Sequence, residues 1–322
     1  MFLRDFVTII KNCNYSNTYK MMWAKALVEI ALESDLDTHD NDIEITLEQI
    51  AHKALKYYFN HTMFFNLIQG SNPNKPPVIQ TCANDLIKLV QDIRQSTQPV
   101  RFEKAIPLIQ NNPLYESILK KTITTLKQDV SYRFIKLSGD TYDNLYSYKK
   151  GYNALIISNK NMQILKDYAF MLFDIINYRW ALILETFNSS PRIAKKVKFN
   201  DETDLKRQSL KKYYHMIALD NPQKNCFICG EPIQGQPDID HVIPWSYMYS
   251  DDIWNLVFTH KECNVSKSNN IPNEYDISKL QNRNNNLLKI METQGETHKK
   301  VYHELSLANK ENLVKKYWIG CQ

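Results

Sequence analysis

Apolar residues recur at helical spacing along most of the chain before residue 130. The apolar side chains of the stretch 19–32 fall on one broad helical face, which carries Met22, Ala26, Leu27, Val28 and Ile30. The next helical pattern, ITLEQIAHKALKYYF, opens with Thr46 and Gln49, a pair whose side chains satisfy free amides at a helix start. After the helix-breaking segment NPNKPPVIQ, an amphipathic run continues over residues 82–93. This pattern predicts a helical first part of the chain.

The pattern changes between residues 132 and 158. The segments YRFIKL and YNALIIS are short and rich in residues that favour strands, so we expect a small hairpin or sheet there. A long helical pattern follows over residues 161–187 and ends at the sequence SSP. Helical patterns return near the end of the chain, over residues 277–291 and 299–318. The chain as a whole is predicted to be mainly α with a small α+β part.

Composition narrows the class of protein. The chain has 322 residues, of which 43% are hydrophobic and 11% aromatic, enough for a large core and too many for disorder along most of its length. Its most apolar stretch, DYAFMLFDIINYRWALILETF, is interrupted by Asp174, Arg179 and Glu185, so we expect no membrane span. The start, MFLRDFVTIIKN, is typical of an amphipathic helix rather than of a signal peptide. Six cysteines without the pattern of a secreted disulfide framework favour a cytoplasmic protein.

The charge of the chain gives a weaker indication of its binding partner. The net charge of +5 fits a nucleic-acid partner without requiring one. A basic run holds eight Lys or Arg residues against three acids: Arg192, Lys195, Lys196, Lys198, Lys206, Arg207, Lys211 and Lys212. Such a run is equally typical of a solvated linker and of a surface that contacts phosphates. On the second interpretation, Lys195 and Lys196 are candidate nucleic-acid contacts.

Two short motifs have the spacing of metal ligands. Cys226 and Cys229 form one pair, and His260 and Cys263 form another. Each pair can close a tight turn that points both side chains at one ion, and three sulfurs with one nitrogen complete a tetrahedral zinc site. A closed coordination sphere leaves no position for water or substrate. The motifs therefore predict a structural Zn²⁺ site.

The segment between the two motifs, DIDHVIP, contains polar residues that this zinc does not need. Alternation along an extended segment puts Asp238 and Asp240 on one face and His241 on the other. Asn255 and Asn264 follow further along the chain. Since oxygen donors suit a hard cation such as Mg²⁺, we expect a second, open metal site beside a histidine that can take a proton.

This order of residues over 226–270 resembles the HNH endonuclease family, whose ββα-metal motif places two strands and a helix around a divalent ion. It is most similar to the zinc-knuckle form of McrA-type restriction nucleases, and DIDHVIP and CNVSKSNN also resemble the HNH domain of CRISPR RNA-guided nucleases. There are two departures: Asn264 stands where the family often has His, and His260 where many relatives have a fourth Cys. The resemblance implies a zinc-stabilised ββα-metal domain between a large helical N-terminal region and a helical C-terminal tail.

The resemblance also implies roles for single residues. His241 would be the general base, and Asp240 and Asn264 would hold the catalytic Mg²⁺ or Mn²⁺. Asn255 would fix the loop that orients His241. Two further residues, Lys267 and Ser268, are candidates for phosphate contact, although Lys267 is as readily an ordinary exposed lysine. Asp238 is either a supporting residue of the site or, more simply, a surface residue.

We expect three segments: a helical region for target choice, regulation or partner binding over residues 1–215, the nuclease domain over 216–275, and a helical extension over 276–322. The N-terminal region resembles no family of known activity. Its aromatics either pack in a core or form a base-stacking pocket: Trp23, Tyr57, Tyr58, Phe64 and Phe65.

The expected function is a DNA endonuclease of restriction or anti-phage defence that acts on double-stranded DNA, with a second copy or a defence protein as a further partner. The alternative is a zinc-stabilised nucleic-acid-binding module without catalysis. The combination of Asp240, His241 and Asn264 favours the nuclease, because binding alone requires none of these three residues.

Overall fold

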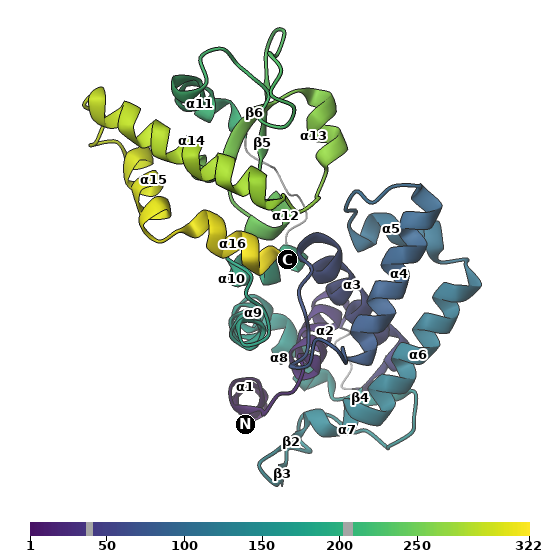
Figure 1. Ribbon diagram of the computed structural model, residues 1–322. Helices are drawn as coiled ribbons and strands as arrows, with labels where there is room; N and C mark the ends of the chain where they lie inside the picture. Colours follow the sequence, from purple (N-terminus) through teal and green to yellow (C-terminus); the bar gives the residue numbers. More distant parts are fainter. Residues whose placement is uncertain (37–40, 202–208) are drawn as a thin grey trace. The chain divides into compact units, whose positions relative to one another are not determined.

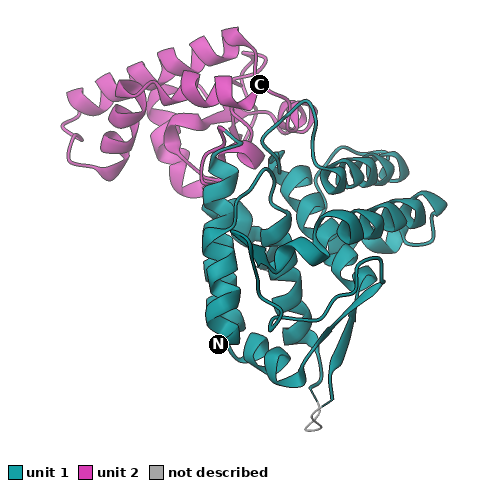
Figure 2. Cartoon of the chain, turned by 90° about the horizontal axis from the view of Figure 1, so that it is seen from below, with its two compact units in different colours: residues 1–188, 193–202 teal, residues 189–192, 203–322 magenta. Residues whose placement is uncertain are grey.

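A computed structural model describes residues 1–36, 41–201 and 209–322. Contacts within the chain divide it into two compact units, one of residues 1–188 with 193–202 and the other of residues 189–192 with 203–322 (Figure 2). The chain is mainly helical with a few short strands, as the sequence pattern predicts (Figure 1). The functional boundaries expected near residues 215 and 275 are not tested by this division and stay predictions.

The first unit consists of helices with two small sheets. Its helices are α1 (Phe2–Asn12), α2 (Tyr19–Glu33), α3 (Leu47–Phe65), α4 (Val78–Arg94), α5 (Phe102–Ile109), α6 (Pro113–Asp129), α7 (Ser131–Phe134), α8 (Asn159–Asp167), α9 (Ala169–Glu185), α10 (Ile193–Lys198) and the 3₁₀ turn η1 (Phe199–Asp201). Its strands are β1 (Ile43–Thr46), β2 (Lys136–Leu137), β3 (Asp140–Thr141) and β4 (Ala154–Ile157). The capping box expected at Thr46 and Gln49 is present at the start of α3.

Helix α2 lies at the centre of this unit, packed against α3, α8 and α9. Eleven of its fifteen residues are buried, so it is buried on nearly all sides rather than on the one broad face expected. One of the buried residues is Lys25, whose Nζ lies 2.6 Å from Asp201 Oδ1 and 2.9 Å from Asn177 Oδ1. A buried charge is tolerated only with such partners.

The aromatic residues of the first unit form its core. Trp23, Tyr57 and Tyr58 are fully buried, and the ring of Trp180 packs edge-on against both tyrosines. Phe65 is also buried, and Phe64 lies 4.5 Å from Phe199 between ring centroids. The core interpretation is therefore confirmed for Trp23, Tyr57, Tyr58 and Phe65, which cannot form a base-stacking pocket, while Phe64 is half-buried.

The expected hairpin over residues 132–158 is only partly correct. Residues 136–137 pair with 140–141, while β4 pairs antiparallel with β1 from more than a hundred residues earlier, with Ile157 opposite Ile43. Residues 132–134, expected as part of a strand, belong instead to the helical turn α7. The long helix expected over 161–187 is interrupted at Tyr168, whose backbone leaves helical geometry between α8 and α9.

The second unit contains a two-stranded sheet and a further set of helices. Its elements are η2 (Leu210–Tyr213), α11 (Tyr214–Asp220), β5 (Asp238–His241), α12 (Trp245–Met248), η3 (Ile253–Asn255), β6 (Leu256–Thr259), α13 (Lys261–Lys267), α14 (Glu274–Thr293), α15 (Lys300–Lys310) and α16 (Leu313–Cys321). Among the helices of the described residues, none combines the length and the apolar character that a membrane crossing requires.

Strands β5 and β6 are antiparallel, with Asp240 opposite Val257 and His241 opposite Leu256. One face of the sheet therefore carries Asp238 and Asp240 and meets α13, while the other packs toward α11, where Tyr214 and Phe258 rings lie 5.0 Å apart. The helices after residue 273 share the core of this sheet through buried residues such as Leu280, Leu287, Leu305 and Val314.

Candidate functional site

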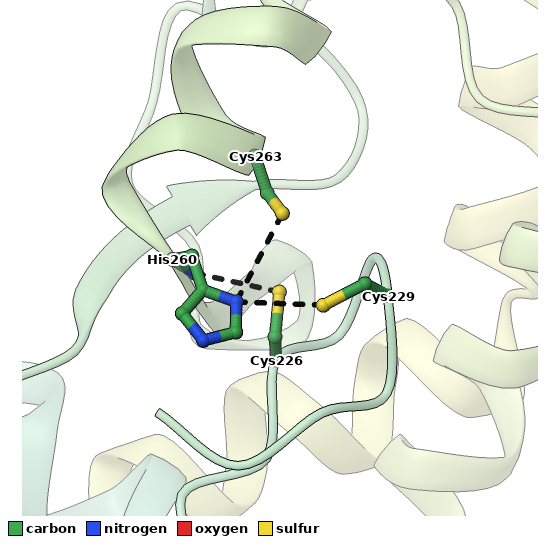
Figure 3. A group of neighbouring side chains, drawn as sticks. All are labelled: Cys226, Cys229, His260 and Cys263. Atoms are coloured by element: carbon green, nitrogen blue, oxygen red, sulfur yellow. Dashed lines mark hydrogen bonds between the residues drawn. The ribbon is translucent and has the colours of Figure 1, made fainter. Parts of the chain in front are cut away.

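The two cysteine-containing motifs meet at one point of the second unit. Cys226, Cys229, His260 and Cys263 each offer one ligand atom, and these atoms all lie within 4.8 Å of one another (Figure 3). The first pair lies on a tight turn closed by a hydrogen bond from Gly230 N–H to the Cys226 carbonyl at 2.8 Å. Gly230 has φ of +83°, a conformation that favours glycine. The second pair comes from the residue before α13 and from its first turn.

The electrostatics of this cluster suit a cation. Burial would raise the pKa of the Cys226 thiol, but hydrogen bonds from the backbone N–H groups of Cys229, His260 and Ile228 lower it to about 7. Desolvation and the neighbouring Cys226 and Cys229 sulfurs raise the pKa of Cys263 to about 11. The raised pKa of Cys263 shows that a further negative charge in the cluster is unfavourable without a cation, and a bound cation would remove that repulsion.

His260 presents its second nitrogen to the cysteines. Its Nε2 lies 3.3 Å from the Pro232 carbonyl, which can only accept, so Nε2 carries the proton and Nδ1 keeps a lone pair. Nδ1 lies 3.4 Å from Cys229 Sγ and 3.9 Å from Cys263 Sγ. Ligands of a tetrahedral zinc ion at its usual bond lengths are about 3.6 Å apart, so the cluster fits such an ion. The cluster can hold a metal ion, and His241 is not part of it.

A second group of polar side chains gathers where β5 ends. His241 is buried, and its Nε2 lies 3.0 Å from Asp251 Oδ1. The hydrogen bond from His241 is the main cause of the lowered pKa of Asp251. Because a carboxylate only accepts, Nε2 carries the proton in the neutral ring and Nδ1 is left with a lone pair.

On the other face of β5, Asp240 is paired with a lysine from α13. Lys267 Nζ lies 2.9 Å from Asp240 Oδ2 and 2.6 Å from the His241 carbonyl oxygen. Lys267 is half-buried in this position, so it is not the ordinary exposed lysine that the sequence left open. The ammonium group of Lys267 therefore compensates the charge of Asp240 in the structure.

Asn255 holds the chain that follows β5. Its Oδ1 accepts from Ile243 N–H at 2.8 Å and its Nδ2 donates to the Ile243 carbonyl at 2.9 Å. The Asn255 carbonyl also accepts from Val242 N–H at 2.9 Å. The side chain is 1% exposed, so these groups have no access to water as a substitute. Its geometry is that of a residue that fixes the backbone beside His241.

We predict that Asn255→Ala lowers the free energy of unfolding by about 2–4 kcal/mol, because it leaves both Ile243 backbone groups buried and unsatisfied. Chemical denaturation checks this value. Asn285→Ala is the matched control, since that asparagine is exposed and, within the described part of the chain, its side chain only accepts one hydrogen bond, from Asn309. Equal stability of the two variants would contradict the role given to Asn255.

The other expected site residues are placed as follows. Asn264 is half-buried on α13, one turn before Lys267 and therefore on the same side of that helix. Ser268 is exposed directly after the helix, with φ of +48°. Asp238 is half-buried opposite Thr259.

One of the two nucleic-acid contacts predicted in the basic run is wrong. Lys195 is exposed on α10, but Lys196 is fully buried, with its Nζ 5.7 Å from the centroid of the Phe65 ring. A buried ammonium group cannot contact a phosphate, so Lys196 is wrong as a nucleic-acid contact. Lys206 and Arg207 of the same run lie outside the described residues.

Asp251 is a candidate site residue that the sequence did not single out. It lies ten residues after His241 in a loop, next to a second acid, Asp252. The two acids have different partners, because Arg192 binds Asp252 at 3.1 and 3.2 Å while Asp251 faces His241. The pair of acids was the only signal in the sequence, and it does not say which of the two turns toward the histidine.

Comparison with known proteins finds a family match for the segment that contains the site and none for the rest of the chain. No curated protein and no solved structure matches the chain. The N-terminal region is not recognised. The resemblance noted over residues 226–270 is confirmed, since residues 228–273 match the family model of the HNH endonucleases.

Proposed function

We propose that the chain is a metal-dependent DNA endonuclease that hydrolyses phosphodiester bonds with His241 as general base. The observation that carries the proposal is the arrangement at the end of β5, within the segment that matches the HNH endonucleases. There His241 is held by Asp251, and Asp240 of the same strand is held by Lys267. A module that only binds nucleic acid has no need of a histidine with one nitrogen fixed and the other free to take a proton.

The chain's own residues divide the chemistry between them. His241 takes the proton from an attacking water at Nδ1, since Nε2 is engaged by Asp251. Asp240 and Asn264 would hold a divalent ion, Mg²⁺ or Mn²⁺, and such an ion would supply positive charge for the phosphate and for the leaving 3′ oxygen. The side chains of Asp240 and His241 point from opposite faces of β5. A phosphate that contacts both residues therefore has to bind at the end of the strand.

Other residues support this arrangement. Lys267 carries its charge beside Asp240, and with Ser268 it is a candidate contact for a phosphate oxygen. The ion in the cluster of Cys226, Cys229, His260 and Cys263 is proposed to be zinc, with a structural role. That ion would join the turn before β5 to the start of α13 and so maintain the distance between Asp240 and the helix.

The proposal extends to the biological setting. We infer a cytoplasmic restriction or anti-phage defence enzyme acting on double-stranded DNA, because the motif is most similar to McrA-type restriction nucleases. The ββα unit is small and contacts mainly phosphates, so the first unit is the candidate for target choice or for binding a defence protein. Exposed Lys195 of that unit remains a proposed DNA contact. Cutting both strands symmetrically requires two catalytic centres, which favours a homodimer.

The test is nicking of supercoiled plasmid DNA by the purified chain. We expect conversion to open circles with Mg²⁺ or Mn²⁺ and none with EDTA. Substrates should include modified and unmodified DNA, because target choice is not encoded in the motif. If the protein retards DNA in gels but nicks none of these substrates with either ion, the alternative of a binding module without catalysis is correct.

We predict that Asp251→Asn lowers kcat for nicking by about tenfold to a hundredfold, within the total contribution of roughly 10²–10⁴ that a general base makes. The imidazole stays in place, but its orientation and tautomer are no longer fixed. The KM for DNA should not change, which separates this effect from a loss of fold. Asp251→Glu should recover part of the rate, and Asp252→Asn serves as the neighbouring control. An unchanged kcat in Asp251→Asn would remove Asp251 from the mechanism.

A further inference from the structure

A cavity of about 580 Å³ opens beside Asp240 and Lys267 in the second unit. It lies between the cysteine turn, the Asp240 face of the sheet, α13 and the start of α14. Its volume is within the roughly 300–1,000 Å³ typical of sites for small molecules. Asp240, Lys267 and Cys263, which have proposed roles above, line part of this cavity, and the roles given to them leave its apolar part unused.

The lining of the cavity is mainly apolar. Ile228, Val242, Val257 and Ile271 line it together with the ring of Phe227. That ring is held from one side by Lys279, whose Nζ lies 4.5 Å from the ring centroid and donates to the Phe227 carbonyl. A planar apolar ligand therefore finds a fixed aromatic ring and aliphatic side chains around it.

Thr259 provides the clearest sign of a missing partner. It lines the cavity from β6, is fully buried, and its hydroxyl has no hydrogen-bond partner among the described residues. Buried hydroxyls are nearly always paired, so an unpaired one beside a cavity points to a polar group of a ligand. The half-buried carboxylate of Asp276 also lines the cavity and can accept from ligand N–H groups.

The charges decide which kind of ligand fits. Glu262 and Asp276 both line the cavity, and its one lining cation, Lys267, is already paired with Asp240. The scissile phosphate is placed at Asp240. A second phosphate group bound deeper in the cavity would be repelled by the carboxylates of Glu262 and Asp276. A neutral aromatic ring with N–H donors meets apolar surface, the Thr259 hydroxyl and the Asp276 carboxylate. The interior thus favours a nucleobase, while a phosphate belongs at the Asp240 end.

We propose that this cavity binds the base of the nucleotide next to the scissile phosphate, turned out of the base stack. This inference rests on the proposed function, because it places the phosphate of that nucleotide at Asp240. Turning out a base costs less where it is mismatched, damaged or single-stranded, so the cavity would make such positions preferred cutting sites.

The test compares two probes on full-length protein carrying His241→Ala, so that no cutting occurs. One probe is a deoxynucleoside 3′,5′-bisphosphate, tried with each of the four bases, and the other is the same sugar bisphosphate without a base. Calorimetry in Mg²⁺ should show at least one base-bearing probe binding about tenfold more tightly than the base-less one. Thr259→Val should reduce this ratio by about threefold, in line with one lost hydrogen bond.

Two bulky variants complete the design. Ile271→Trp, from an exposed position that lines the cavity, should bring the ratio to about one. Ile319→Trp, from an exposed position that does not line it, should leave the ratio unchanged. A ratio near one in the His241→Ala parent, binding of neither probe, or a ratio that survives Ile271→Trp overturns the proposal. Plasmid nicking by wild-type protein alongside a ratio near one would reject the base site and keep the nuclease.

Discussion

His241→Ala will reduce plasmid nicking by at least about a hundredfold while leaving zinc content and melting temperature close to those of the wild type. General-base catalysis contributes roughly 10²–10⁴ to a hydrolysis rate, and no other described side chain at the end of β5 is held in the same way with a nitrogen left to take a proton. The imidazole is buried against the loop of Asp251, so its removal costs some packing, but the strand pairing of β5 does not depend on it. Initial rates of conversion to open circles measure the effect.

The comparison needs two further variants. Asp240→Ala should also abolish nicking, because it removes the proposed carboxylate ligand of the divalent ion, and its circular dichroism should remain that of the folded protein. His298→Ala, an exposed histidine in the same unit, should nick at the wild-type rate. Retention of more than a tenth of the activity in His241→Ala would mean that another group accepts the proton. Gross unfolding of Asp240→Ala would contradict its proposed role in metal binding and favour a structural role instead.

The parts of the site that the sequence predicts are those encoded by short spacing. Two pairs of metal ligands, each three residues apart, determine a turn and the first turn of a helix, and strand alternation separates Asp240 from His241. Asp251 escapes such reasoning because its contact with His241 depends on the path of a loop. That path is fixed by partners distant in sequence, among them Arg192.

The same distinction holds for the fold. Most helices and the capping box at Thr46 follow from local patterns, although the helices expected over 161–187 and 299–318 are each divided into two. The pairing of β4 with β1 joins segments far apart in the chain, and neither segment indicates its partner. Burial is equally non-local: Lys196 carries a charge in a basic run, yet the packing of α10 places it beneath the surface against Phe65. The sequence shows which residues are polar. Which of these polar residues become buried depends on the elements that pack against the helix, and the sequence of the helix does not show these elements.

Cys229→Ser will release the zinc ion and lower the melting temperature sharply, with a loss of several kcal/mol in the free energy of unfolding. A structural zinc site contributes roughly 10–16 kcal/mol of apparent binding free energy, and a serine oxygen is a poor replacement for a thiolate. Cys229 is the informative position because its side chain is exposed, so the substitution removes little packing. A large destabilisation must then come from the metal rather than from a cavity.

Emission spectrometry and thermal unfolding measure the two effects together. Cys321→Ser is the control, because that cysteine belongs to the same unit but not to the cluster, and it should keep one zinc ion per chain. Nicking by Cys229→Ser should fall as well, since α13 carries both Cys263 and Lys267, which binds Asp240. If Cys229→Ser keeps its zinc, or loses it without any change in melting temperature, the ion does not stabilise this unit. The geometry around Asp240 would then have to be maintained by the packing of α13 and α14 alone.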